Sequence, residues 1–273
     1  MEKHGQGLLP SPYDVRDYSL AYSAINYGDL PESFQLESIG IKDQGDKPTC
    51  AAHTISELIE YHNFIQNRIF LNFSTEFIYG ARESDYYIGD GMYLREAMKI
   101  AQQKGDVLYE VLPGNSDVNE AMQKVQERKS ELLSKAYPNR ISTYYKIDSE
   151  KAMKYALMHD GPVAGGMKLY DHSDWNDKAV YIFNPTDSWS GHAVLVIGWT
   201  EDYWIIQNSW GYNWGDHGLF YIPITENFED IFLEAYGATD NINEIIIPTK
   251  SSSCIKWFYP IINMFKNLKW IKK

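Results

Sequence analysis

Apolar residues recur at helical spacing along the chain as far as His159. Between Thr49 and Asn67 they fall on most of the helix surface, so we predict a helix that is buried at the centre of the fold. The dipeptide Pro48-Thr49 supplies its start signal. The same spacing predicts further helices over 75–83, 92–104, 117–136 and 150–159, of which 117–136 is expected on the surface.

Short apolar runs bounded by turn residues replace this spacing after Gly161-Pro162. They predict strands over 163–169, 179–183, 192–199, 203–207 and 218–224. Helices followed by strands indicate an α+β fold with two lobes and a cleft between them. We expect an ordered body over 31–245, with a helical lobe over about 44–140 and a sheet lobe over about 141–245.

Two segments flank this body. Residues 1–30 contain Pro10, Pro12 and Gly28, which predict an extended arm on the surface. Residues 246–273 form a tail that holds five lysines and no acidic residue from position 254 onward. Apolar residues recur in this tail at helical spacing, at Trp257, Ile261, Met264, Phe265, Leu268 and Ile271. Two interpretations stay open: an amphipathic helix on a membrane or protein surface, or a helix packed on the acidic body.

The composition excludes several classes of protein. The 273 residues carry a net charge of −12, which argues against a nucleic-acid binder because phosphate contacts need clustered cations. A hydrophobic content of 44% argues against general disorder. No run of 18 apolar residues exists, so we expect no membrane span. A monomer is a separate expectation.

The two cysteines, Cys50 and Cys254, make at most one disulfide, so a reducing compartment is the default. The first ten residues include Glu2, Lys3 and His4 and contain no apolar core of signal-peptide length. We therefore expect no secretory signal and an intracellular, cytoplasmic location.

Cys50 is the first candidate for chemistry. It lies in the opening turn of the predicted central helix, where free N–H groups and the helix dipole favour an anion. A thiol at such a position is expected to have a lowered pKa. Taken alone, a single cysteine is more often a small buried apolar residue.

His192 and Asn208 are the next candidates. A hairpin centred on Thr200 places residue 192 opposite residue 208, with both side chains on one face. An amide oxygen that accepts from the imidazole N–H fixes the tautomer and leaves the other ring nitrogen for a nucleophile.

Gln44 lies six residues before Cys50. A side-chain amide at this place, together with the backbone N–H of the nucleophile, suits an oxyanion hole. Gln44, Cys50, His192 and Asn208 therefore supply each part of an acyl-transfer site. The sequence contains no metal-binding spacing, and we expect neither a metal nor another cofactor.

These motifs resemble those of the papain/cathepsin-type cysteine peptidases over residues 30–225. The resemblance rests on Gln44-Gly45 with Cys50, on Gly191-His192-Ala193, and on Asn208-Ser209-Trp210-Gly211 followed by Trp214-Gly215. It implies a helical lobe facing a β-barrel-like antiparallel sheet lobe, and a polypeptide substrate. It also implies roles for Cys50 as nucleophile, His192 as base, Asn208 as its orienting group and Gln44 as oxyanion donor. Trp210 would shield the His–Asn hydrogen bond, and the backbone of Gly91 would pair with substrate.

The sequence departs from the family pattern near the nucleophile. Lys47 occupies the place of a disulfide cysteine, and Ala51 occupies the place of the tryptophan that follows the nucleophile. The long helical propeptide of secreted members is not expected. In these respects the chain looks more like bacterial and viral members, which adds a virion-associated location to the expectations.

The sequence predicts a cysteine endopeptidase that forms a thioester on Cys50. Two alternatives stay open: an inactive relative that binds a peptide or protein, and a transpeptidase or amidase that uses the same thioester. His53 is a competing base, although we expect it to be a packed or hydrogen-bonded histidine. A further hypothesis is that residues 1–30 cover the cleft and hold the enzyme latent.

Overall fold

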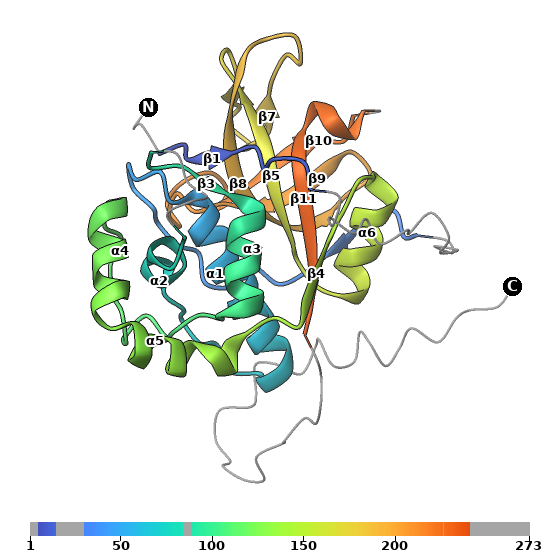
Figure 1. Cartoon of the computed structure of the whole chain (residues 1–273). Coiled ribbons are helices and arrows are strands. Elements are labelled where there is room, and N and C mark those ends of the chain that lie inside the picture. Colours follow the sequence, from blue (N-terminus) through green and yellow to red (C-terminus); the bar gives the residue numbers. More distant parts are fainter. Residues whose placement is uncertain (1–4, 15–29, 84–88, 226, 241–273) are drawn as a thin grey trace, which may run out of the picture. The chain divides into compact units, whose positions relative to one another are not determined.

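Helices pack against both faces of an antiparallel sheet in the computed structural model, most of them on one face and α6 on the other (Figure 1). The structure describes residues 5–14, 30–83, 89–225 and 227–240. The longest helix, α1, runs over Cys50–Asn67 and lies between the other helices and the sheet. The other helical elements are α2 (Thr75–Gly80), α3 (Leu94–Gln103), α4 (Val118–Glu127), α5 (Lys129–Ala136), η3 (Tyr137–Asn139), α6 (Glu150–His159) and η4 (Phe228–Asp230).

The main sheet has the strand order β10-β9-β8-β5-β11-β4, and every neighbouring pair along this path is antiparallel. Its strands are β4 (Thr143–Lys146), β5 (Val163–Tyr170), β8 (Trp189–Trp199), β9 (Tyr203–Gln207), β10 (Leu219–Pro223) and β11 (Phe232–Thr239). The mixture of helices with an antiparallel sheet confirms the predicted α+β class.

Short strands extend this sheet. β2 (Phe34–Gln35) pairs with the end of β8, and β1 (Leu8–Leu9) joins β8 to β3 (Met92–Tyr93). A separate hairpin consists of β6 (Asp174–Trp175) and β7 (Tyr181–Ile182). Residues from the beginning of the chain therefore take part in the sheet, which the division into helices and then strands did not predict.

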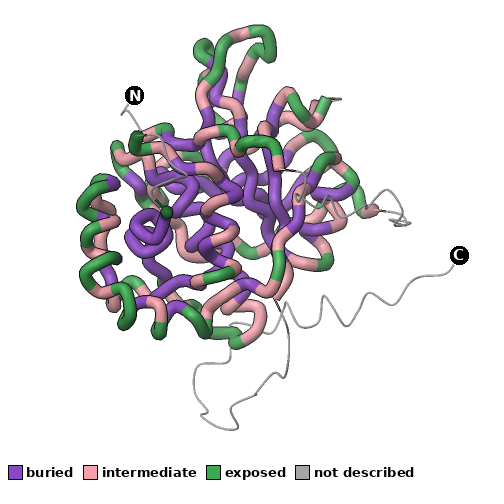
Figure 2. Tube along the Cα trace, in the orientation of Figure 1, coloured by how far each residue is buried: buried purple, intermediate pink, exposed green. Residues whose placement is uncertain are grey.

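The main sheet separates two hydrophobic cores. On one face Ala193, Leu195 and Ile197 of β8 pack toward α1, and on the other face Val194 and Val196 pack with residues of α6 and β10. Because both faces are covered, β8 is apolar along most of its length rather than alternating. Figure 2 shows the resulting buried centre, with α4 and α5 exposed at the outside.

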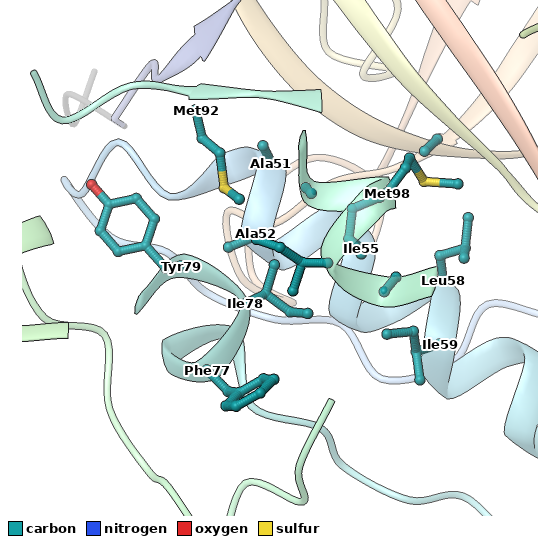
Figure 3. Packing of buried hydrophobic residues seen from close by; sticks show 14 of the residues in the cluster. Ala51, Ala52, Ile55, Leu58, Ile59, Phe77, Ile78, Tyr79, Met92 and Met98 are labelled. Carbon is teal, nitrogen blue, oxygen red and sulfur yellow. The ribbon is translucent and has the colours of Figure 1, made fainter. Parts of the chain in front are cut away.

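The residues of α1 explain its central position. Every residue from Cys50 to His62 is buried, and the side chains of Ile55 and Ile59 lie among those of α2 and α3. Figure 3 shows these contacts with Ile78 and Met98. The predicted helix over 49–67 is therefore confirmed, and it ends at Arg68 in a left-handed conformation with φ 55°.

The predicted surface helix over 117–136 is wrong in one respect, because the chain divides it into α4 and α5. The break is at Arg128, which has φ −113° and ψ 19°. Its guanidinium donates to the carbonyl of Val111 at 3.0 Å and to Glu131 at 2.9 Å. These bonds hold the break in place, so each half buries its own apolar face.

The predicted β8–β9 register is also wrong. A hairpin centred on Thr200 would pair Leu195 with Ile205, whereas Leu195 pairs with Gln207. The turn runs from Thr200 to Tyr203, and the N–H of Thr200 donates to the carbonyl of Tyr203 at 2.7 Å. The centre of the hairpin therefore lies after Glu201, and Asn208 follows β9 instead of pairing inside the ladder.

Strands β4 and β11 were not predicted, because Glu234 and Gly237 interrupt the apolar pattern of β11 and β4 is only four residues long. Two predictions lie outside the described residues: the helix in the tail 246–273, and most of the arm 1–30. Among the residues that the structure describes, no helix is both long and apolar enough to cross a membrane.

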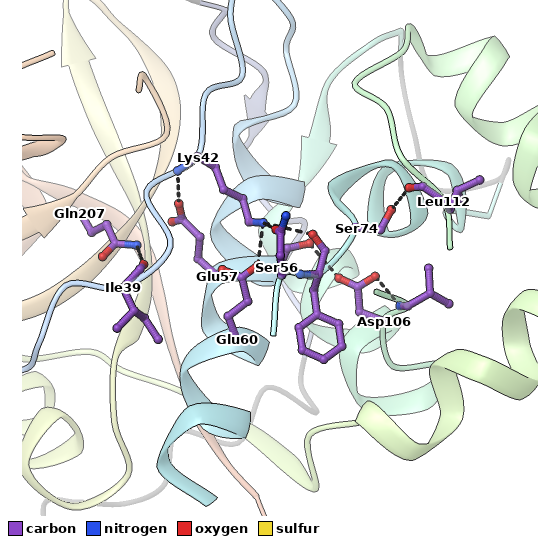
Figure 4. Close-up of polar contacts among 12 residues, drawn as sticks. Ile39, Lys42, Ser56, Glu57, Glu60, Ser74, Asp106, Leu112 and Gln207 are labelled. Atoms are coloured by element: carbon purple, nitrogen blue, oxygen red, sulfur yellow. Dashed lines mark hydrogen bonds and ion pairs between the residues drawn. The ribbon is translucent and has the colours of Figure 1, made fainter. Parts of the chain in front are cut away.

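Buried carboxyl groups surround Lys42 beside α1 (Figure 4). Lys42 Nζ lies 2.6 Å from Glu60 Oε1, and the Lys42 N–H donates to Glu57 Oε1 at 3.3 Å. Asp106 accepts from Ser56 Oγ at 2.8 Å. Burial raises the pKa of all three carboxyl groups, and raises that of Glu60 to about 7. The group therefore joins the segment before α1 to the helix itself.

The stability of the fold should decrease between pH 5 and pH 8. Because the pKa of Glu60 is about 7 in the folded chain against 4.5 for the free group, folding favours the protonated form, and this contribution is lost as pH rises through 7. We expect Glu60→Gln to flatten the pH dependence of the urea unfolding midpoint. The exposed Glu201→Gln is the control. An unchanged pH dependence in Glu60→Gln would contradict the assignment.

Candidate active site

The sulfur of Cys50 lies at the N-terminus of α1, against the beginning of the apolar part of β8. It accepts hydrogen bonds from the N–H groups of Ala193, of Gly7 in the N-terminal arm, and of Ala51. Ala193 follows His192, so these bonds bring Cys50 beside the candidate base. Burial is nevertheless the largest influence, and it raises the pKa of the thiol.

His192 and Asn208 form a buried hydrogen-bonded pair. The imidazole Nε2 lies 2.9 Å from Asn208 Oδ1, and both residues are completely buried. The same oxygen accepts the backbone N–H of Ser209 at 2.9 Å. Because Oδ1 is an acceptor, Nε2 carries the proton, and the other ring nitrogen, Nδ1, is the one suited to accept a proton from a nucleophile. The predicted meeting of these two residues is present, although the predicted register was wrong.

Trp210 covers this pair. Its ring centroid lies 4.8 Å from that of His192, and only 7% of the residue is exposed. Trp175 and Trp214 contact Trp210 edge-on, with ring centroids 5.5 Å and 4.7 Å away. This arrangement excludes water from the His–Asn bond, which strengthens it.

Gln44 is buried and held at three of its atoms. Its Oε1 accepts from Ser209 Oγ at 2.6 Å, and its backbone N–H donates to the carbonyl of Ser209 at 2.8 Å. Its Nε2 donates to the carbonyls of Gly5 and Lys47, both at 2.8 Å. The amide donor is therefore fixed in direction. Ser209 bonds to both Gln44 and Asn208. No role was predicted for Ser209, although it lies between Asn208 and Trp210 in the chain.

The N-terminal arm lies in the candidate site. The carbonyl of Gly5 accepts from Gln44, the N–H of Gly7 donates to the Cys50 sulfur, and the carbonyl of Gly7 accepts from Met92 N at 2.8 Å. Leu8, which is 4% exposed, pairs with Met92 and with Gly191. The arm thus contacts Cys50 and Gln44, and it lies between β3 and β8.

The arm and its neighbours approach each other too closely for side chains at several glycines. A Cβ atom on Gly7 would lie 2.0 Å from the carbonyl oxygen of Pro48, and one on Gly191 would lie 2.5 Å from that of Leu8. Both separations are shorter than a non-bonded contact, so the fit requires glycine.

Gly91 lies beside the arm, and its expected pairing with substrate stays a prediction. The carbonyl of Gly91 accepts from Arg82 at 2.8 Å, while the backbone donor to the arm is Met92. A Cβ on Gly91 would lie 2.7 Å from Leu9 Cγ. Gly91 therefore leaves space for Leu9 of the arm, and the backbone N–H of Met92 bonds to Gly7 of the arm.

Farther along, the arm reaches Arg95 and Glu234. The N–H of Ser11 donates to Glu234 Oε1 at 3.3 Å, and the Arg95 guanidinium donates to the carbonyl of Pro12. Burial raises the pKa of Glu234. These contacts were not predicted, because residues far apart in the sequence supply them.

His53 is not oriented as a competing base. Its Nδ1 lies 3.0 Å from the carbonyl oxygen of Thr49, one turn earlier in α1. Burial lowers the pKa of His53 to about 4, so the ring is neutral at pH 7 and its Nδ1 donates to that carbonyl. This agrees with the expectation of a hydrogen-bonded histidine.

A family model for the papain family of cysteine proteases matches residues 30–239. The chain belongs to this family. A cysteine protease of Blomia tropicalis is 27% identical over 229 residues, which cover 74% of this chain and 63% of that protein. A viral cathepsin of Spodoptera litura multicapsid nucleopolyhedrovirus is 26% identical over 198 residues, covering 70% and 56% of the two chains.

The similarity of fold extends to solved structures of cysteine proteases. Xylellain, a cysteine protease of Xylella fastidiosa, superimposes with a TM-score of 0.70 at 20% identity, over 88% of this chain and 97% of that one. The matched regions span between 21% and 63% of the length of the curated relatives, so the comparisons establish family and fold. Within the described residues, no group of three or more His, Cys, Asp or Glu side chains is arranged to hold a metal ion.

Cys50 should react slowly with iodoacetamide in the native full chain. Its thiol is buried beneath the arm and its pKa is raised, so both access and the thiolate fraction are reduced. We expect much slower alkylation at pH 7.5 than in the urea-unfolded chain. After the reaction each sample is digested, and the alkylated fraction of the peptide that contains Cys50 is measured by mass spectrometry. Equal rates in the two states would contradict the arrangement.

Proposed function

We propose that this chain is a cysteine endopeptidase that hydrolyses peptide bonds through a thioester on Cys50. One observation carries the proposal: the Cys50 sulfur is bonded to the N–H of Ala193, next to a histidine whose tautomer Asn208 fixes. A nucleophile, a base and a group that orients the base are the parts that nucleophilic acyl transfer requires.

The first half of the proposed reaction forms the thioester. Once the arm leaves and water enters, Cys50 transfers its proton to His192, and the helix N-terminus stabilises the thiolate. The sulfur attacks the substrate carbonyl carbon, and the oxyanion accepts hydrogen bonds from Gln44 Nε2 and the Cys50 N–H. The imidazolium then protonates the amine, which leaves as the C–N bond breaks.

The second half releases the acid. His192 accepts a proton from a water molecule, which attacks the thioester carbonyl, and the same donors hold the second oxyanion. The C–S bond breaks and the proton returns to the Cys50 sulfur. The Asn208 amide keeps the ring oriented during both proton transfers.

The contacts of the arm support an extended polypeptide as the substrate. Leu8 lies in a ladder between Met92 and Gly191, so the groove pairs with backbone groups rather than with a particular side chain. The arm continues past Cys50 in both directions, from Gly5 to Pro12. A groove that accepts chain on both sides of the nucleophile supports cleavage inside a chain rather than at its end.

Cys50→Ala should abolish hydrolysis. Loss of the nucleophile in a comparable catalytic group reduces kcat by roughly a millionfold, so we expect no peptide product above the uncatalysed level. The assay is mass spectrometry of a peptide library digested by the full chain and, in parallel, by the full chain carrying Leu8→Asp, with and without Cys50→Ala. Asn139→Ala, a helical-lobe residue whose amide donates to the carbonyl of Asp106 at 2.9 Å, is the control. Full activity in Cys50→Ala would contradict the proposal.

We infer also that residues 5–12 block the groove until they are displaced. A substrate backbone needs Gln44 and Met92, which the arm already occupies through Gly5 and Gly7. Leu8 anchors this segment, because its side chain is buried against the position of Gly166, where a Cβ would lie 2.7 Å from Leu8 Cδ2.

Leu8→Asp should activate the full chain. A carboxylate in place of the buried leucine removes about 2 kcal/mol of apolar burial and adds the cost of desolvating a charge, which favours the displaced arm by roughly thirtyfold or more. We expect kcat/KM for a peptide substrate to rise, and Cys50 alkylation to rise with it. Tyr13→Asp, at an arm residue that is 90% exposed, is the matched control. If Leu8→Asp folds normally and shows neither increase, the arm does not block the groove.

A further inference from the structure

The turn from Gln44 to Cys50 carries both the amide donor and the nucleophile. Cys50 is a free cysteine and the turn contains no other cysteine, so its geometry depends on hydrogen bonds. We propose that Asn115 is a positioning residue that holds the two ends of the turn together. The proposal rests on the proposed function and adds to it a residue outside the predicted site.

Asn115 bonds to both ends of the turn through one side chain. Its Nδ2 donates to the backbone carbonyl of Gln44 at 2.8 Å, and its Oδ1 accepts from Thr49 Oγ1 at 3.0 Å. Asn115 belongs to the loop between α3 and α4 and lies 71 residues from Gln44 in sequence. The pair of bonds spans the turn, as a covalent cross-link at this place would.

The loop that carries Asn115 is itself fixed. The buried carboxylate of Glu76 accepts from the N–H of Ser116 at 2.8 Å and from Lys124 Nζ at 2.9 Å. Lys124 also donates to Ser116 Oγ at 2.6 Å. A Cβ on Gly114 would lie 2.9 Å from the Glu76 carboxyl carbon. The residues on both sides of Asn115 are therefore held against Glu76, and the amide is oriented before the turn meets it.

The bond to Thr49 has a second effect. Thr49 is the N-cap residue of α1, yet its side chain makes no capping hydrogen bond. A threonine at this position ordinarily accepts from an N–H of the first turn. Here the hydroxyl donates to Asn115, and the N–H of Ala51 in the first turn is directed at the sulfur. The bond to Asn115 thus holds the Thr49 side chain in a position from which it makes no capping bond, and the Ala51 N–H stays available to the thiolate.

The proposal predicts two separable effects of Asn115→Ala. Release of the Gln44 carbonyl loosens the amide donor and lowers kcat, by roughly tenfold if the loosened donor loses part of the hundredfold or more that a whole one supplies. Release of the Thr49 hydroxyl lets it accept from the helix N–H groups, so the pH profile of Cys50 alkylation moves to higher pH. A structural role alone would move neither the kcat nor the alkylation profile.

The experiment uses the full chain carrying Leu8→Asp, and the unsubstituted chain in parallel. Both kcat and the pH dependence of iodoacetamide alkylation are measured for Asn115→Ala, Thr49→Val and the double variant. In the double variant the Thr49 hydroxyl is absent and cannot accept from the helix N–H groups. We therefore expect its alkylation profile to match that of the parent chain, while its kcat stays as low as in Asn115→Ala. Asn139→Ala, another amide that donates to a backbone carbonyl, should change neither quantity.

The outcomes separate this proposal from the others. If Asn115→Ala keeps the kcat and the alkylation profile of Asn139→Ala, Asn115 is not a positioning residue. If no variant hydrolyses peptides, the proposed function fails, while the alkylation profiles still test the Thr49 bond. Should Asn115→Ala unfold at the assay temperature, Asn115→Asp keeps the size and the acceptor for Thr49 but loses the donor to Gln44. A kcat equal to that of the parent chain in Asn115→Asp would overturn the proposal.

Discussion

The close contact between the start of α1 and β8 is the constraint on which the rest of the structure depends. Ala51 and Ala52 are small, and they pack in one core with Ala193 and Leu195 of the strand. This lets the helix N-terminus reach the strand at the point where His192 is carried. Cys50 and His192 come from different secondary structures, α1 and β8, so their meeting depends on the packing of the helix against the strand.

Much of this arrangement could be predicted from the sequence, and the reasons differ between its parts. The helical spacing of apolar residues in α1 and the short apolar runs of β8 and β9 are local signals. They predicted the α+β class and the contact between His192 and Asn208. The details of that meeting were wrong because the Thr200 hydroxyl sets a longer turn. The break at Arg128 and the contacts of Asn115 depend on residues distant in sequence, which no local pattern records.

The arm changes the chemistry of the site as well as its access. Under the arm, burial raises the pKa of the Cys50 thiol although the N–H groups of Ala193, Gly7 and Ala51 point at the sulfur. Desolvation therefore outweighs the hydrogen bonds that favour the thiolate. Under the proposal that the arm blocks the site, its displacement lets water return; the N–H groups of Ala193 and Ala51 remain while that of Gly7 leaves, so the desolvation that raises the pKa of the thiol is reduced. One segment would then govern both the space for substrate and the charge of Cys50.

Ser209 has a consequence for how the groove opens. It bonds to Gln44 through its backbone carbonyl and its hydroxyl. Next to it, Asp43 and Trp210 form an isolated antiparallel β-bridge, and the N–H of Gly211 donates to the Lys42 carbonyl at 2.9 Å. The segment before α1 and the segment after β9 are thereby fastened along a continuous row of hydrogen bonds. A hinge motion at this side of the groove would break that row. If the arm blocks the site as proposed, a substrate would enter by displacing β1, while this row of hydrogen bonds stays intact.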